Sequence, residues 1–245
     1  MSDPDDVPDA DVALIQGEQP ASAKLPLDRD RIVAAAIAFI DEFGLPGLTM
    51  RRLGGILGVE AMSLYRYVPG KEALLDAVVD SLVEQMEIDE HVLRTPDNGW
   101  QDFLHRLAHG IRRIALAHPT AFPLIASRPP EAPWLRPPLR SLSWVEDFLA
   151  GLTAEGFDEE SAVGAYRGFT SFLLGHLLLE VSTHGADVGP LDVLDEGEFT
   201  KKGLGAFPLV KKLRPLLSED RAAIEFEDAL ENLLDRLALV RSESS

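Results

Sequence analysis

The sequence contains no cysteine among its 245 residues. It therefore cannot form a disulfide, a thiolate zinc site or a cysteine nucleophile, and this composition suits a reducing compartment. Long hydrophobic runs are also missing, because the longest one, around 169–181, is interrupted by Gly175, His176 and Glu180. Such a run is too short and too polar to span a bilayer. The N-terminal segment 1–24 has neither the basic nor the apolar region of a signal peptide, and we expect a cytoplasmic protein.

Positive charge is scarce, with 23 basic against 41 acidic residues and a net charge of −18. This charge argues against nonspecific binding of nucleic acid by the whole surface, because phosphate attraction dominates such binding. The charge is unevenly spread, however. Residues 1–26 hold one base and six acids, residues 27–71 hold six bases and five acids, and residues 72–245 hold 16 bases and 30 acids. The block 27–71 is thus the one part of the chain that escapes the acidity.

Hydrophobic residues make up 46% of the chain, enough for a sizeable core, and their spacing predicts an all-α fold. Residues 1–26 are rich in Asp and Pro and are expected to form a disordered acidic tail. Helices are expected over the following ranges: 28–43, 49–57, 60–68, a longer one from Lys71, 100–117, 122–126, 139–155, 159–184, 208–216 and 219–240. We divide the chain into the tail, a first domain at 27–73 and a larger helical domain at 74–241.

Two short helices around a glycine are expected between residues 49 and 68. Thr49 can cap the first helix, Gly58 can adopt the positive φ that a tight turn needs, and Pro69 follows the second helix. Small and apolar residues that can anchor both helices are Leu53, Gly54, Leu57, Val59, Leu64 and Val68. This is the spacing of a helix-turn-helix.

The second of these helices presents one face away from the anchoring residues. That face carries Ala61, Met62, Ser63, Tyr65 and Arg66. In a major groove, Arg66 can hydrogen-bond guanine, and Met62 and Tyr65 can contact thymine methyl groups. Ser63 can contact a base or a phosphate. Four flanking residues suit phosphate contacts, which position a protein without reading sequence: Thr49, Arg51, Tyr67 and Lys71. The pattern alone fits equally well a short helical hairpin with core tyrosines and a solvated arginine.

Residues 27–82 resemble the N-terminal domain of the tetracycline-repressor family of regulators. Three motifs carry the resemblance: a helix ending in FG, then GLTMRRLGGILGV, then SLYRYVPGKEALL. The resemblance implies a three-helix DNA-binding head, joined by the helix from Lys71 to a ligand-binding body. It also implies that operator DNA is met by Arg51 and by the face of Ala61, Met62, Ser63, Tyr65, Arg66 and Tyr67, with Lys71 on the backbone. Family members often have a polar residue in place of Ala61, so the operator sequence does not carry over.

The rest of the chain is similar to the tetracycline-repressor branch of that family, through GWQDFLHRLAHGIRRIALAHP, LIASRPP, GFTSFLLGHLLLE and FEDALENLLDRL. The resemblance implies a homodimer through a four-helix interface, here near 159–183 and 219–240. An apolar stripe on the last helix supports such an interface: Phe226, Leu230, Leu233, Leu234, Leu237 and Val240. The alternative is a core helix that packs within its own chain.

The ligand site departs from that branch. The two histidines and the glutamate that hold a drug–magnesium chelate there align with Ser171, Leu124, and Leu179 or Glu180. We therefore expect no metal-chelate site and no cofactor, and instead a small organic effector in a largely apolar cavity. Candidate apolar lining residues are Phe103, Leu107, Ile111, Leu124, Trp134, Trp144, Phe148, Phe169 and Phe172. Candidate polar residues are His105, His109, Ser127 and Arg140.

His105 and His109 lie four residues apart and can share one helical face. We predict no metal there, because no carboxylate stands between them as in a zinc hydrolase motif. The sequence also has no phosphate-binding glycine loop and no nucleophile elbow, so an enzyme is not expected. The leading hypothesis is a homodimeric, ligand-responsive repressor that binds a pseudo-palindromic operator in double-stranded DNA. The alternative is a helical small-molecule-binding protein with weak or lost DNA binding.

Overall fold

The computed structural model describes residues 26–88, 98–128, 134–137, 141–186 and 206–243, together with residues 96 and 132. The helices are α1 (Arg29–Phe43), α2 (Met50–Leu57), α3 (Ala61–Leu64), α4 (Lys71–Ile88), α5 (Trp100–Ala117), α6 (Pro123–Ser127), α7 (Leu142–Ala154), α8 (Glu159–Ser182), α10 (Pro208–Leu217) and α11 (Ala222–Glu243). A short 3-10 turn, η1 (Leu45–Gly47), follows α1. No strand occurs in these residues, and the predicted all-α class is confirmed. The predicted tail lies, apart from Pro26, outside them.

Capping residues fix where several helices begin. Asp28 accepts a hydrogen bond from the backbone N–H of Arg31, and Asp158 accepts one from Ser161. Such bonds satisfy donors that the first turn of a helix leaves free. Gly44 follows α1 with a φ of 78°, a conformation that favours glycine, and turns the chain toward α2. The predicted start of the first helix at Asp28 is therefore confirmed.

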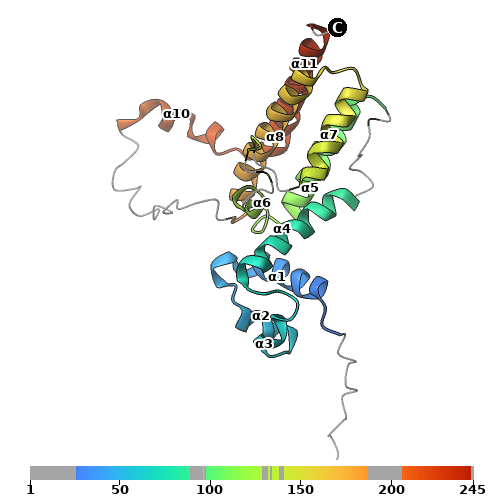
Figure 1. Cartoon of the computed structure of the whole chain (residues 1–245). Coiled ribbons are helices and arrows are strands. Elements are labelled where there is room, and N and C mark those ends of the chain that lie inside the picture. Colours follow the sequence, from blue (N-terminus) through green and yellow to red (C-terminus); the bar gives the residue numbers. More distant parts are fainter. Residues whose placement is uncertain are drawn as a thin grey trace, which may run out of the picture.

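The helices form two packed groups at opposite ends of α4 (Figure 1). The first group, α1 to α3, packs on the start of α4 around buried Ile32, Ile40, Leu53 and Leu64. In the second group α5, α7, α8 and α11 run side by side as a bundle. The predicted domain boundary between residues 73 and 74 falls inside α4, so one continuous helix connects the groups. The division into two functional domains stays a prediction.

Helix α10 stands apart from the bundle in Figure 1. None of its residues is buried, although Leu209, Leu216 and Leu217 are apolar. No helix among the described residues has both the length and the apolar character that a membrane crossing requires.

Candidate functional site

The turn between α2 and α3 depends on two glycines with different roles. Gly58 adopts a left-handed conformation, with φ 68° and ψ 32°, that ends α2. Gly54 lies where the helices cross, and a Cβ added there would stand 2.9 Å from the backbone oxygen of Val59 and 3.2 Å from the nitrogen of Ala61. The backbone of α3 can approach α2 this closely because Gly54 has no side chain. The predicted helix-turn-helix geometry follows from this contact.

The outer face of α3 and the turn after it is open to solvent. Met62 is 75% exposed, and Tyr65, Arg66 and Tyr67 are exposed as well. Leu64 and Val68, on the opposite face, are buried in the core of the first group. The alternative in which the tyrosines are core residues is therefore wrong, and the face predicted from the sequence is available to a partner.

Helix α3 is shorter than predicted, since it spans Ala61–Leu64 rather than residues 60–68. The backbone N–H of Tyr67 donates to the carbonyl of Leu64 at 3.0 Å, a tightened turn of three residues. Pro69 prevents the helix from resuming after this turn, because it lacks an N–H and disfavours helical conformation at Val68. Tyr65 to Tyr67 are thus held on a turn.

The flanking residues proposed for phosphate contacts surround this face. The Thr49 hydroxyl accepts a hydrogen bond from the backbone N–H of Arg52 at 3.2 Å, as the cap of α2. The Arg52 guanidinium donates to the Gly47 carbonyl at 3.1 Å, whereas Arg51 is exposed. Lys71 is the first residue of α4, where free backbone N–H groups favour anions. The sequence reasoning did not identify Arg52 as the residue that fixes the turn before α2.

Two polar contacts join the first group of helices to the bundle. The first lies between α1 and the end of α5, where an imidazole nitrogen of His118 is 2.7 Å from a carboxylate oxygen of Asp41. The other carboxylate oxygen of Asp41 accepts a hydrogen bond from the backbone N–H of Ala121 at 3.2 Å. Asp41 therefore fixes the α5–α6 turn against α1.

Arg128, directly after α6, makes the second contact. Its guanidinium donates to Asp76 of α4 at 2.9 and 2.6 Å and to Glu72 of α4 at 2.7 Å. The hydrogen bonds that Arg128 donates to Glu72 and to Asp76 raise the pKa of Arg128, so the group stays charged. Neither contact was predicted, because the partners are far apart in the sequence.

The predicted ligand-binding residues divide between the bundle core and its surface. Phe148 of α7 is the centre of an aromatic cluster with Phe103, Trp144, Tyr166 and Phe169, at centroid distances of 6.2, 5.6, 5.8 and 5.5 Å. Phe103, Phe148 and Phe169 are buried, and Trp144 packs against them. Four of the predicted lining residues are thus brought together by α5, α7 and α8.

Tyr166 of α8 belongs to this cluster but was not predicted. Its hydroxyl donates to the carbonyl of Pro137 at 3.0 Å. Burial raises the pKa of Tyr166 to about 12, against a smaller lowering by the neighbouring Thr170 side chain. Tyr166 and the buried Thr170 therefore place neutral hydroxyl groups beside the rings. The spacing Tyr166, Phe169, Thr170 on one face of α8 is the sequence signal that could have identified them.

The other predicted lining residues are aliphatic or lie outside this cluster. Leu107, Ile111 and Leu124 are buried in the same hydrophobic core as Phe148. Trp134 is 75% exposed on a turn and is not part of the buried core, so its predicted lining role stays a prediction. Ser127 is exposed and donates back to the carbonyl of Leu124 at the end of α6. Arg140 lies outside the described residues.

A second aromatic group surrounds Phe226 of α11. Its ring lies 5.9 Å from Phe172, 5.3 Å from His176 and 5.5 Å from His109, and the guanidinium of Arg112 lies 5.1 Å above it. Phe172 therefore belongs to this group, apart from Phe148.

Glu180 of α8, one of the positions aligned with the chelate glutamate, is buried and paired within its own chain. Its carboxylate accepts two hydrogen bonds from Arg112 of α5, one of them at 3.0 Å. The hydrogen bond to Glu180 raises the pKa of Arg112. Leu179, the other aligned position, is 71% exposed.

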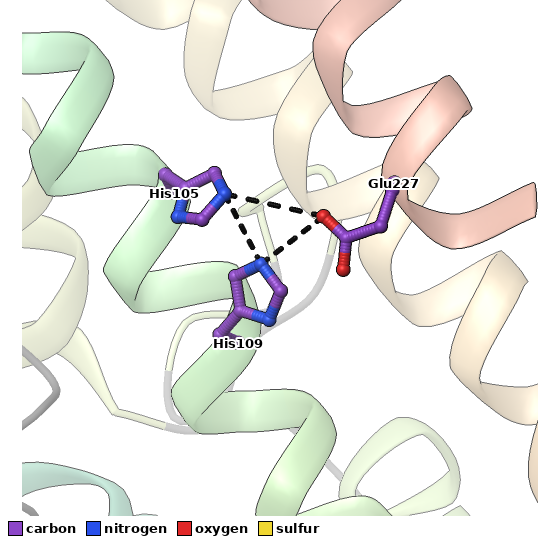
Figure 2. Close-up of side chains that lie close together, drawn as sticks. All are labelled: His105, His109 and Glu227. Atoms are coloured by element: carbon purple, nitrogen blue, oxygen red, sulfur yellow. Dashed lines mark hydrogen bonds and ion pairs between the residues drawn. The ribbon is translucent and has the colours of Figure 1, made fainter. Parts of the chain in front are cut away.

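His105 and His109 lie on the surface of the bundle, beside α11, and not among the rings around Phe148. Figure 2 shows both imidazoles and the carboxylate of Glu227 turned toward one point. Burial lowers the pKa of His109, while the Glu227 carboxylate acts in the opposite direction. The sequence offered no sign of Glu227, because the carboxylate comes from a different helix.

The apolar stripe on α11 faces mainly into its own chain. Phe226 and Leu230 are fully buried and Leu237 is nearly so, because they pack on α8 and α5. For these three residues the alternative of an intrachain core helix is correct. The outer faces of α8 and α11 still expose Val163, Leu179, Ile224 and Leu239.

Comparisons with known proteins agree with this arrangement. The family model for the bacterial regulatory proteins of the tetR family matches residues 32–78, and the model for the tetracyclin repressor-like C-terminal domain matches residues 94–240. The HTH-type transcriptional repressor DrrR1 of Streptomyces coeruleorubidus is 32% identical over 160 residues. The match covers 65% of this chain and 56% of that repressor, so the chain spans little more than half of its length.

Two solved structures from Streptomyces coelicolor are similar over most of their length. A possible TetR family transcriptional regulator is 31% identical, with a TM-score of 0.68, covering 87% of this chain and 100% of that one. The TetR family protein ActR, in complex with actinorhodin, is 25% identical with a TM-score of 0.64, covering 89% and 99%.

Proposed function

The chain belongs to the TetR family of bacterial regulatory proteins, whose models match both groups of helices, and we propose that it acts as a homodimeric repressor. Two copies of the first group would occupy a pseudo-palindromic operator. A small organic effector in the bundle would release them. The family consists of transcriptional regulators rather than enzymes. We place the protein in the cytoplasm, because its proposed DNA partner lies there.

The observation that carries the proposal is the outward face of α3 and its following turn. Met62, Tyr65, Arg66 and Tyr67 are exposed together, while Leu64 and Val68 hold the segment from behind. This segment exposes three aromatic or long apolar side chains to water. A partner that covers them is favoured, because it removes their apolar surface from water. We assign base contacts to Met62, Tyr65 and Arg66 and phosphate contacts to Arg51 and Lys71.

Dimerisation is proposed through α8 and α11. Along the outer face of α8, Gly164 and Gly175 have open space where a Cβ would stand, and Leu179 is 71% exposed. A helix face with small residues and exposed apolar side chains allows another helix to approach closely. Leu239 extends the apolar surface onto α11. A two-fold axis here would place two α3 segments on one face of a duplex.

For the effector we propose the aromatic cluster around Phe148. Rings of Phe103, Trp144 and Phe169 would separate to admit a flat organic molecule, and the Tyr166 hydroxyl could exchange its bond to Pro137 for one to the effector. ActR, a TetR family protein similar to this chain, has been solved in complex with the organic molecule actinorhodin.

Signal transfer is proposed through Arg128 and Asp41. Both contacts tie the α5–α6 region to helices of the first group, at α4 and α1. An effector that shifts α5 would move the α5–α6 turn and α6 with it, and would therefore pull on α1 and α4 and change the separation of the two α3 segments. Because linkage is reciprocal, operator DNA would weaken effector binding by the same factor.

A salt titration of duplex binding tests the DNA-binding part of this proposal. The full chain should bind a random duplex with an affinity that falls as salt rises, since cations on the protein displace counterions from phosphates. Arg51→Ala should reduce the slope by about 1, whereas Arg214→Ala, on exposed α10, should leave it unchanged. Absence of binding at low salt would favour a small-molecule-binding protein without DNA.

A further inference from the structure

The side chains of His105, His109 and Glu227 form a cluster between α5 and α11 (Figure 2). The Nε2 atoms of the two histidines are 3.2 Å apart, and the Oε2 atom of Glu227 lies 3.3 Å from His109 and 3.9 Å from His105. We propose that these three atoms bind one divalent ion of the zinc class, with at least one coordination position left for water or another ligand. This proposal does not depend on the proposed effector or operator.

The spacing of the three atoms is that of a metal site. Zinc lies about 2.0–2.2 Å from imidazole nitrogen and carboxylate oxygen, so two ligands at a tetrahedral angle stand about 3.4 Å apart. Two sides of the triangle, 3.2 and 3.3 Å, are close to that value. The third side, 3.9 Å, shortens with a small rotation of the half-exposed Glu227 side chain.

The backbone favours this arrangement. Residues four apart on a helix lie on the same face, so α5 presents both imidazoles side by side, with ring centroids 4.3 Å apart. Glu227 reaches them because the neighbouring Phe226 is buried against α5 and α8 and fixes the rotation of α11. The carboxylate is therefore held beside the histidines by the packing of the core.

The donor set selects the kind of ion. Two imidazole nitrogens and one carboxylate oxygen suit zinc, copper or nickel, whereas magnesium and calcium prefer oxygen ligands alone. Three protein ligands with an open position resemble the coordination of exchangeable zinc sites rather than closed structural ones.

The nearest cation does not prevent binding. Arg112 lies one turn after His109, but its guanidinium is bound by Glu180 and stacked on Phe226. Its charge is thus compensated before an ion arrives. With Glu227 included, the cluster carries a net negative charge that favours a divalent ion.

A competing account needs no ion, because the two imidazoles can hydrogen-bond one another while His109 pairs with Glu227. The two accounts differ in the effect of zinc on the stability of the bundle. An ion that ties α5 to α11 stabilises the folded chain by an amount that grows with the logarithm of the free ion concentration divided by Kd, whereas a hydrogen-bonded pair gives no such response.

The test uses the full chain without a polyhistidine tag, stripped of metal with a chelator. Calorimetric titration with Zn²⁺ should show one ion per chain, zinc should raise the unfolding temperature, and Co²⁺ should give the visible absorption of a four- or five-coordinate site. His105→Ala and Glu227→Gln should each weaken zinc binding by at least about tenfold, the loss typical even of outer ligand partners. Both side chains are about half exposed, so neither change threatens folding.

His184→Ala is the matched control, since this exposed histidine follows α8 and contacts Thr183 and the carbonyl of Glu180 instead of the cluster. It should bind zinc as the unchanged chain does. The proposal is overturned if zinc does not bind saturably. It is also overturned if His105→Ala and Glu227→Gln keep the original affinity, because the ion would then sit elsewhere on the acidic surface.

Discussion

Arg128 and Asp76 are joined by two hydrogen bonds, at 2.9 and 2.6 Å, that tie the end of α6 to α4. The Arg128 side chain is only 14% exposed, so this pair is better shielded from water than an ordinary surface ion pair. Glu72, the other partner, is 78% exposed, so water screens its hydrogen bond to Arg128 more than that of Asp76. The Arg128–Asp76 contact is therefore the main polar connection between α6 and the helix that carries the DNA-binding group.

Arg128→Met should lower the free energy of unfolding by about 1–2 kcal/mol, because Asp76 would lose its charged partner while half-buried. It should also reduce the effect of operator DNA on the thermal unfolding of the body. Denaturant titration and calorimetry with and without DNA measure both. Arg214→Met, on exposed α10, is the control and should change neither. If operator DNA changes the thermal unfolding of Arg128→Met as much as that of the unchanged chain, the bundle and the DNA-binding group are coupled through other contacts.

Gly54 and Gly55 are neighbours in α2, but we expect their replacement by alanine to have opposite effects on stability. Gly54→Ala should destabilise the first group of helices by about 1–3 kcal/mol, since the new Cβ would meet the Val59 oxygen at 2.9 Å. Gly55→Ala has open space and should stabilise the chain by about 0.5–1 kcal/mol through helix propensity. Denaturant titration of both variants checks this. Equal effects would show that α2 and α3 do not cross at Gly54.

Arg66 and Lys71 are predicted to contribute differently to DNA binding. Arg66→Ala should weaken the free energy of operator binding by about 1–3 kcal/mol. It should also relax the base preference at the one operator position that Arg66 contacts. Lys71→Ala should weaken binding to every duplex alike and lower the salt slope by about 1. Binding of a series of single-base operator variants separates the two. The division of roles is wrong if both changes weaken all duplexes equally.

Leu179 tests the proposed dimer. Leu179→Glu would place a carboxylate in the α8–α11 interface of each copy, and should weaken self-association by at least roughly tenfold, because the charge would be buried unpaired. Sedimentation at several protein concentrations measures this. Leu142→Glu, at the exposed start of α7, is the matched control and should leave the dimer intact. The interface lies elsewhere if the two variants sediment alike.

Local signals in the sequence predicted the fold well. Asp28, Thr49 and Gly58 act as the caps and turn that their residue types suggest, because these roles depend on neighbours within a few positions. The outward face of α3 was predicted for the same reason. The early end of α3 was not predicted, because the helical spacing of Leu64 and Val68 continues through the turn, where the Val68 N–H still donates to the Leu64 carbonyl at 2.9 Å.

Contacts between distant segments could not be predicted in this way. Nothing near Arg128 in the sequence indicates Asp76, and nothing near His109 indicates Glu227. The exposed position of Trp134 was missed because an aromatic residue in a proline-rich segment has no periodic pattern that places it inside or outside. The ligand-binding role of the Phe148 cluster stays a prediction.

Selection of duplexes from a random pool by the full chain, followed by sequencing, tests the central claim most directly. The account predicts enrichment of a pseudo-palindrome whose half-sites lie about 10–11 base pairs apart, or a multiple of that distance, bound by two chains. Arg66→Ala should reduce the base preference at one position in each half-site. No enrichment at low salt, or enrichment of a single half-site bound by one chain, would contradict a dimeric repressor that reads DNA through α3.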